Sequence, residues 1–201
     1  MKKALLITPK SKSVPYLEGY DYIGVDSGSL LILEHGYPLL FSVGDFDSME
    51  SDCMDQIRKA GPVYQHPVMK DETDSELACR LCIEKGYGEI ILWGAISGRL
   101  DHTLSNIQLL LVRSSKIRLM DEFQSVMVLD PGQYVFDPDY HHVSFFAMEP
   151  SCISLDGFLY PLCHQDVQPT DMYLVSNMIV GSHASVTIHK GRFLCVESNY
   201  K

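Results

Sequence analysis

The sequence predicts an α/β protein in which an open, mainly parallel sheet domain is followed by a small all-β sandwich domain. Through residues 1–130, short apolar runs alternate with helical patterns, which is typical of βαβ units. Several runs are apolar without a break, as in strands buried on both faces of a parallel sheet. After residue 131 the segments become short and rich in β-branched and aromatic residues. We therefore expect the α/β domain at 1–130 and the sandwich at 131–201.

The expected elements of the first domain follow from these patterns. A helix at 48–60 follows a Ser-Met-Glu-Ser start, and a second helix begins at Thr73, which stands three residues before Glu76 in the spacing of a capping box. A third helix at 101–112 carries apolar residues at helical spacing. The expected strands are 4–8, 22–25, 40–43, 63–65, 90–93, 117–120 and 126–129.

The second domain shows no helical pattern. Lys190-Gly191 is typical of a hairpin turn that closes the last two strands. A domain of about 70 residues buries its own faces poorly, so docking on the first domain or on a second subunit would stabilise it. The expected strands are 133–136, 142–146, 153–155, 172–175, 184–189 and 193–196.

Charge and composition narrow the class of protein. With 16 Lys and Arg against 26 Asp and Glu, the formal net charge is −10, which argues against a nucleic-acid-binding protein. An acidic protein can still bind a polyanion such as ATP when divalent cations stand between carboxylates and phosphates. No stretch approaches the roughly 18 apolar residues that span a bilayer. The apolar run 4–7 is too short for a signal peptide, so we expect a cytoplasmic protein.

Six cysteines at irregular spacing do not indicate a disulfide scaffold. Cys79 and Cys82 form a C-x-x-C pair on an expected helix. A zinc site would need a second ligand pair, which the sequence lacks. A redox role stays open, but packing in the core is the favoured interpretation.

Acidic residues cluster where the expected strands end. Since the carboxyl ends of parallel strands meet at one edge of an open sheet, which is where ligands bind, these side chains should converge there. So many carboxylates would repel one another, and Mg²⁺ completed by substrate phosphates would relieve that repulsion. Helix capping is the alternative for Asp26 and Asp47 taken singly. The residues concerned are Asp26, Asp45, Asp47, Asp71, Asp74 and Asp101.

Two motifs sharpen this hypothesis. In Gly44-Asp45-Phe46-Asp47-Ser48, alternating acids on an extended segment would face one side and share a metal ion, although D-x-D also occurs in phosphatases and sugar transferases. In the loop 94–102, small residues would let the backbone approach phosphate. Arg99 would clamp a phosphate or pair with an acid, and His102 would orient a ligand. No Walker-A motif is present, and Lys70 is the favoured lysine for a phosphate contact.

Taken together, these motifs resemble those of the thiamine pyrophosphokinase family, in order and approximate spacing, over essentially the whole chain. In the second domain, 157–162 and Ser176-Asn177 are similar to the family's thiamine-side segments. The family commonly has D-G-G at 26–28, a Gly at Ser97 and an acid at Met178. The matching elements are Asp26-Ser27-Gly28, Gly44-Asp45-Phe46-Asp47-Ser48, Lys70-Asp71-Glu72-Thr73-Asp74, Gly98-Arg99-Leu100-Asp101-His102 and Ser105-Asn106.

The resemblance implies transfer of diphosphate from ATP to the hydroxyl of thiamine, giving thiamine diphosphate and AMP, by a Mg²⁺-dependent homodimer with shared sites. It implies catalytic roles for Asp71, Asp74, Arg99 and Asp101. For the attack of the hydroxyl, a carboxylate such as Asp71 or Asp74 is our own hypothesis for the proton acceptor. The implied metal ligands are Asp45, Asp47, Asp71, Asp74 and Asp101. The implied ATP and thiamine contacts are Asp26, Gly28, Ser48, Lys70, Thr73, Gly98, His102, Tyr160, Ser176 and Asn177.

Two rival functions remain at this point. One is an aspartyl-phosphate phosphatase with Asp45 as nucleophile, although such enzymes place D-x-D after their first strand and here it follows about the third. The other is a non-enzymatic module that binds thiamine or a nucleotide. Formation of AMP from ATP in the presence of thiamine separates the enzyme from the module.

Overall fold

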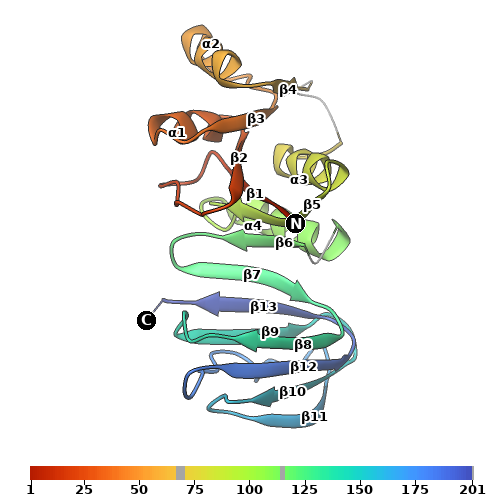
Figure 1. Cartoon of the computed structure of the whole chain (residues 1–201). Helices are drawn as coiled ribbons and strands as arrows, with labels where there is room; N and C mark the ends of the chain where they lie inside the picture. The colour runs from red at the N-terminus through yellow and green to blue at the C-terminus, as the bar shows by residue number, and fades with distance from the viewer. Residues whose placement is uncertain (67–70, 114–115, 201) are drawn as a thin grey trace. The chain divides into compact units, whose positions relative to one another are not determined.

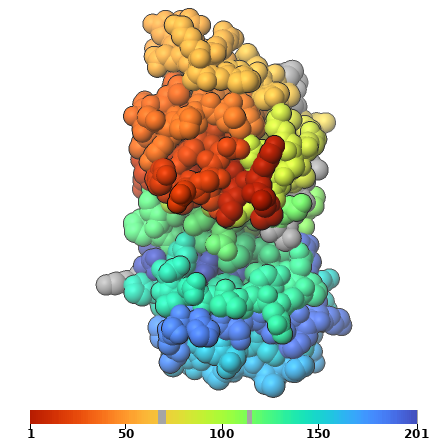
Figure 2. Space-filling model, viewed as in Figure 1, coloured from red at the N-terminus to blue at the C-terminus, as the bar shows by residue number. Residues whose placement is uncertain are grey.

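A computed structural model describes residues 1–66, 71–113 and 116–200. The chain divides into two compact units, Met1–Asp121 and Glu122–Lys201. Figure 1 shows the elements of each unit, and Figure 2 shows the N-terminal segment, coloured red, at the surface of the first unit. No helix among the described residues is long and apolar enough to cross a membrane.

The first unit is built on a six-stranded sheet in which every neighbouring pair of strands is parallel. Most side chains of the central strands are fully buried, which explains their unbroken apolar sequences. The strand order is β4-β3-β2-β1-β5-β6. The strands are β1 (Lys2–Ile7), β2 (Tyr20–Val25), β3 (Leu39–Gly44), β4 (Val63–Gln65), β5 (Tyr87–Trp93) and β6 (Ile117–Met120).

Four helices connect these strands: α1 (Gly28–Glu34), α2 (Ser51–Ala60), α3 (Asp74–Glu84) and α4 (Leu100–Arg113). The last three confirm the predicted helices, although α2 begins three residues later than expected. The sequence did not predict α1. It is only seven residues long, and its run of four apolar residues is too short to show helical periodicity.

The strand order creates a switch point between β1 and β5. From β1 the chain continues through β2 to β4 on one side, and it then returns to place β5 on the other side of β1. The loops that follow β1 and β5 therefore diverge at the carboxyl edge of the sheet. In open α/β sheets, this divergence makes the crevice in which ligands bind.

The second unit is an antiparallel sandwich. One of its sheets has the order β7-β13-β9 and the other β11-β10-β12-β8. Both contribute to one apolar core, in which Phe145 and Phe193 are among the largest fully buried side chains. The strands are β7 (Gln124–Leu129), β8 (Gly132–Phe136), β9 (His142–Ala147), β10 (Ser151–Asp156), β11 (Leu162–Val167), β12 (Ala184–Lys190) and β13 (Phe193–Ser198).

Two expectations about this unit were wrong, and one strand was not predicted. Residues 172–175 form no strand, and β11 was missed because it is a polar edge strand with only Val167 fully buried. The last two strands do not form a hairpin: β12 pairs with β10 and β8, whereas β13 pairs with β7 and β9. Gly191, at a φ of 77°, instead turns the chain from one sheet to the other.

The division between the units lies at Asp121, whereas the sequence places the domain boundary after residue 130. The intervening strand β7 is an unbroken apolar run like those of the parallel sheet, with five of its six residues buried. β7 is hydrogen-bonded to the antiparallel strand β13, which lies in the second unit. The apolar sequence of β7 therefore gave no sign that the strand pairs in the antiparallel direction with β13.

Candidate active site

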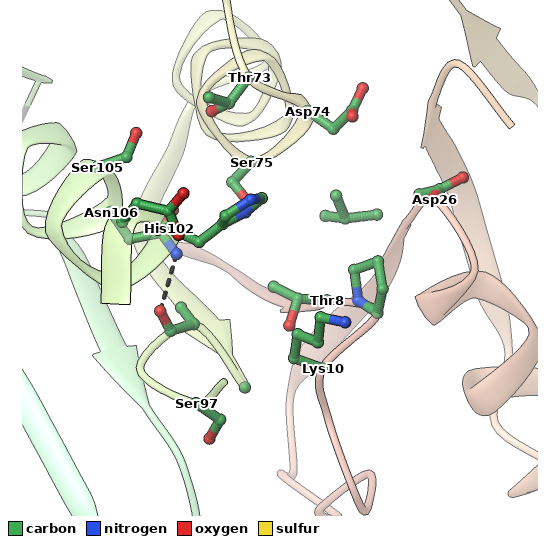
Figure 3. Close-up of a pocket in the computed structure, with 15 residues that line it drawn as sticks. Thr8, Lys10, Asp26, Thr73, Asp74, Ser75, Ser97, His102, Ser105 and Asn106 are labelled. Carbon is green, nitrogen blue, oxygen red and sulfur yellow. Dashed lines mark hydrogen bonds between the residues drawn. The ribbon is translucent and has the colours of Figure 1, made fainter. Parts of the chain in front are cut away.

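A cavity of about 510 Å³ opens at the carboxyl edge of the parallel sheet (Figure 3). It is formed by the loops that follow β1, β2 and β5 and by the first turns of α3 and α4. These are the segments that the switch point brings together. The lining residues are Thr8, Pro9, Lys10, Val25, Asp26, Thr73, Asp74, Ser75, Gly94, Ala95, Ser97, Asp101, His102, Ser105 and Asn106.

The loops after β1 and β5 are joined by hydrogen bonds. The Thr8 N–H and the Ser11 hydroxyl both donate to the carbonyl of Trp93, at 3.1 and 2.9 Å. Gly94 adopts a φ of 76°, and a Cβ there would lie 2.4 Å from the Ser11 hydroxyl. A glycine is therefore required at this position both by the backbone conformation and by the close approach of the neighbouring loop.

The loop 94–98 is also held from α4. The Asn106 side chain donates to the carbonyl of Ala95 at 2.8 Å, which is the dashed line in Figure 3. Ser97 donates to the buried carboxylate of Asp121 at 3.4 Å. These bonds keep the loop backbone at the rim of the cavity.

The N-terminus of α3 closes another side of the cavity. Thr73 caps the helix, because its hydroxyl accepts the Glu76 N–H at 3.1 Å, as the capping-box spacing predicts. Asp74 lies in the first turn, and in Figure 3 it appears with Thr73 and Ser75 on the side of the cavity opposite Lys10. The partial positive charge of this helix end favours anions.

Arg99 and Asp101 form an exposed ion pair at the start of α4. The guanidinium Nε and Nη2 donate to the two carboxylate oxygens at 3.1 and 2.6 Å. This hydrogen bonding lowers the pKa of Asp101 below its ordinary value. The salt-bridge alternative for Arg99 is therefore observed. His102 lines the cavity, and its backbone N–H also donates to Asp101.

Asp26 follows β2 in the left-handed region, at a φ of 49°. Partial burial raises the pKa of its carboxyl group, the backbone N–H of Ser27 opposes this shift, and the negative charges of Asp74, Asp45 and Asp47 add to it. The negative charges of three other carboxylates therefore reach Asp26, as expected where acids converge at a sheet edge.

The D-x-D segment is not extended, which corrects the geometry expected for it. Strand β3 ends at Gly44, and Phe46 adopts a φ of 56° while its ring is buried in the core of the first unit. Asp45 accepts the Asp47 N–H at 3.2 Å in this turn. Asp47 does not cap α2, whose N-cap residue is Glu50. Burial of the Phe46 ring offsets the backbone strain.

The structure brings only part of the predicted set together. Among the predicted residues that it describes, the cavity is lined by Asp26, Thr73, Asp74, Asp101 and His102. Ser48 lines a separate cavity of about 200 Å³ that also borders Asp26. Lys70 lies outside the described residues. The residues that line neither cavity are Gly28, Asp45, Asp47, Asp71, Gly98 and Arg99.

The predicted metal ligands do not form a cage in this structure. Among the described residues, no group of three or more His, Cys, Asp or Glu side chains could hold a metal ion. Gly28 has a structural role, because a Cβ there would lie 2.0 Å from the carbonyl oxygen of Ile7. This lack of a side chain lets α1 begin directly against β1.

The three predicted thiamine-side residues lie in the second unit. The buried Asn177 side chain accepts the N–H groups of Tyr160 and Met178 and donates to the Tyr160 carbonyl, at 2.9 to 3.0 Å. Asn177 therefore fixes the backbone of the Tyr160 segment, while the Tyr160 side chain is 64% exposed. Ser176 is exposed, and its N–H donates to Ser144.

Cys79 and Cys82 are both buried in α3, and all six cysteines are free. Burial raises the pKa of the Cys79 thiol and raises that of Cys82 to about 12. Thiols in such surroundings stay protonated and unreactive, so the pair is a packing feature of the helix.

The sequence-based hypothesis missed the loop after β1, which contributes Thr8, Pro9 and Lys10 to the cavity. A signal was present. Pro9 and Lys10 directly follow the first expected strand, 4–8, so the same rule that placed the acids places them at the same edge of the sheet.

The fold and the cavity define the class of this protein: an α/β unit with a carboxylate-lined cavity at its switch point, followed by a β-sandwich. Residues 19–120 match the family model described as the thiamin pyrophosphokinase catalytic domain, and 133–193 match its vitamin B1 binding domain. The chain is 34% identical over 200 residues to the thiamine pyrophosphokinase of Bacillus subtilis (strain 168), with 92% of each chain covered. The chain belongs to the thiamine pyrophosphokinase family.

Solved structures agree with this assignment. The thiamine pyrophosphokinase from Bacillus subtilis matches with a TM-score of 0.89 and 30% identity, covering 100% of both chains. A thiamin pyrophosphokinase family protein from Enterococcus faecalis matches with a TM-score of 0.88 and 29% identity, again over 100% of both chains. The fold expected from the sequence is thereby confirmed.

Proposed function

We propose that this chain transfers a diphosphate group from ATP to the hydroxyl of thiamine, giving thiamine diphosphate and AMP. Membership of the family carries the proposal, and the acidic cavity at the switch point supplies a site for the phosphates. The cytoplasmic location stays a prediction from the sequence. The comparisons give no support to the aspartyl-phosphate phosphatase or to the non-enzymatic module.

The phosphates of ATP would bind where α3 and α4 begin. Two helix N-termini, each with backbone N–H groups that have no partner within their own helix, point toward this edge. The loop 94–98, held by Asn106 and Asp121, would bring further backbone close to the ligand. Positioning and neutralisation of charge should supply most of the acceleration of an in-line attack on the β-phosphorus.

The carboxylates of this edge fit Mg²⁺ by their chemistry. Burial raises the pKa of Asp26, the negative charges of Asp74, Asp45 and Asp47 raise it further, and carboxylate oxygens are the ligands that Mg²⁺ binds. Asp45, Asp47, Asp71, Asp74 and Asp101 are the residues proposed to hold it. When bound, Mg²⁺ would neutralise negative charge on the phosphates.

A carboxylate of the chain would accept the proton of the thiamine hydroxyl. Asp71 and Asp74 were the two candidates, and of these Asp74 lines the cavity whereas Asp71 is exposed outside it. We therefore assign the role to Asp74, which lies in the first turn of α3 and lines the cavity.

The thiamine-side residues would act in a homodimer. An apolar surface is exposed on the second unit, where two segments of the chain lie side by side. Two hydrogen bonds of 2.8 Å join the segments: the Leu159 N–H donates to the Met178 carbonyl, and the Val180 N–H donates to the Gly157 carbonyl. We call this the 159–180 surface; its exposed members are Leu159, Tyr160, Val175, Met178 and Val180. Contact with a second copy of the chain would remove this surface from water and complete the thiamine site.

Product analysis tests the function. With ATP, Mg²⁺ and thiamine, wild-type protein should form AMP and thiamine diphosphate in equal amounts, and no AMP when thiamine is omitted. Asp74→Asn and Asp101→Asn should each lower the rate by about 100-fold or more, because each removes a proposed Mg²⁺ ligand and Asp74→Asn also removes the proposed proton acceptor. Asp55→Asn, at an exposed position of α2, is the control and should keep the wild-type rate.

Three results would contradict this proposal. Binding of thiamine and ATP without AMP would favour the module. A burst of phosphoenzyme would favour the phosphatase. Wild-type rates in both cavity variants would refute the site.

A further inference from the structure

We propose that Lys10 is a phosphate-binding residue of the cavity, held in place by the turn Thr8–Ser11. The inference rests on the proposed function, since it concerns how the same cavity binds ATP. Within the described part of the chain, Lys10 is the only lysine or arginine among the lining residues, while Asp26, Asp74 and Asp101 line the same cavity. A cation of the protein would stabilise a polyanion that enters these surroundings, in addition to any bound metal ion.

The backbone of Lys10 is fixed at this place. Thr8 to Ser11 form a β-turn, closed by a bond of 3.1 Å from the Ser11 N–H to the Thr8 carbonyl. Pro9 occupies its second position, where the fixed φ of proline favours such turns. Both ends of the turn are bonded to the Trp93 carbonyl, so Lys10 is carried at the end of β1 and tied to the end of β5.

The side chain of Lys10 lies against the loop 94–98. A Cβ built on Gly98, at a φ of 90°, would stand 3.7 Å from Lys10 Cδ and 3.8 Å from Cγ. The aliphatic stem therefore passes over this glycine. In Figure 3 the side chain lies beside Thr8, opposite Thr73, Asp74 and Ser75.

The ammonium of Lys10 is available to a ligand. Across the described residues it forms no ion pair, although several carboxylates border the same cavity. Arg99, by contrast, is engaged by Asp101 and does not line the cavity. Lys10 is thus the described cation best placed to meet a phosphate that enters between the loops after β1 and β5.

Binding measurements with three probes test the assignment by isothermal titration calorimetry. The probes are α,β-methylene-ATP with Mg²⁺, inorganic triphosphate with Mg²⁺, and adenosine. Lys10→Met should weaken both phosphate probes by about 10- to 100-fold, the loss expected for one hydrogen bond between charged groups, and should change adenosine affinity less than about twofold. Lys10→Arg should retain most of the affinity because it keeps the positive charge.

Lys12→Met is the matched control. Lys12 is exposed two residues further along and does not line the cavity, so this variant should bind all three probes like wild type. Wild-type affinity of Lys10→Met for the phosphate probes, or an equal loss for adenosine, would overturn the assignment; circular dichroism verifies that the variants are folded. None of these probes needs turnover. A wild-type protein that binds these probes but forms no AMP from ATP and thiamine would refute the proposed function, while the binding data would still test the assignment of Lys10.

Discussion

At the scale of single residues, Asp26 lowers the stability of the folded protein in order to place a carboxylate at the site. Its backbone is in the left-handed region, its carboxyl group is partly buried, and three other carboxylates raise its pKa further. Such a group is costly in the folded protein without ligands and is useful where cations and phosphates bind. The same residue therefore carries a prediction about stability.

We expect Asp26→Asn to raise the melting temperature at pH 7 in metal-free buffer. Because the folded pKa lies above the ordinary value of 3.8, the folded state binds more protons than the unfolded state between these two values. Stability therefore falls as pH rises through that window, and the neutral amide avoids this loss. Below pH 3.8 the difference between wild type and variant should disappear.

Thermal unfolding followed by circular dichroism from pH 3 to 7 measures this effect. Asp55→Asn, on the exposed face of α2, controls for the loss of one negative charge from an acidic protein. An Asp26→Asn variant that melts at or below the wild-type temperature at pH 7 would show that the Asp26 carboxylate is not under electrostatic strain.

At the scale of elements, helix α3 was predictable because its start signal is local. Thr73 and Glu76 are three residues apart, and the capping bond they form needs no distant partner. Helix α1 has no such signal, since its N-cap Ser27 makes no side-chain capping bond. Its place depends on Gly28 fitting against the carbonyl of Ile7, which is a tertiary contact.

Thr73→Ala should therefore destabilise the protein by about 1 kcal/mol, the usual cost of losing an N-cap side chain. Urea unfolding in the absence of ligands gives the free energy of unfolding. Thr73→Ser keeps the hydroxyl and should stay close to wild type. Equal stability of the alanine and serine variants would mean that the capping bond does not contribute.

At the scale of the whole molecule, the homodimer is a prediction that the 159–180 surface makes testable. Val180→Glu places a charge on that surface and should convert the dimer to monomer, with loss of AMP formation, because burying an unpaired carboxylate is costly. Val135→Glu is the matched control: Val135 is 73% exposed on β8, against 59% for Val180. Sedimentation velocity at micromolar concentration distinguishes the two states; a dimeric, active Val180→Glu protein would exclude this surface as the interface.

The sequence by itself determined the local features of this protein: the unbroken apolar runs of the parallel strands, the cap at Thr73, and the placement of acids after strands. These features depend on residues a few positions apart, so they are visible without the fold. Thr73 and most of the predicted helices and strands were found in this way.

Only the tertiary structure decided which side chains meet. It assigned β12 and β13 to different sheets, turned the Asp45-Phe46-Asp47 segment out of an extended conformation, and selected Asp26, Asp74 and Asp101 from the predicted acids as lining the cavity. It also placed Lys10 there. Such choices depend on hydrogen bonds and packing between segments more than 80 residues apart, as between Ser11 and Trp93 with a separation of 82, and no local pattern records them.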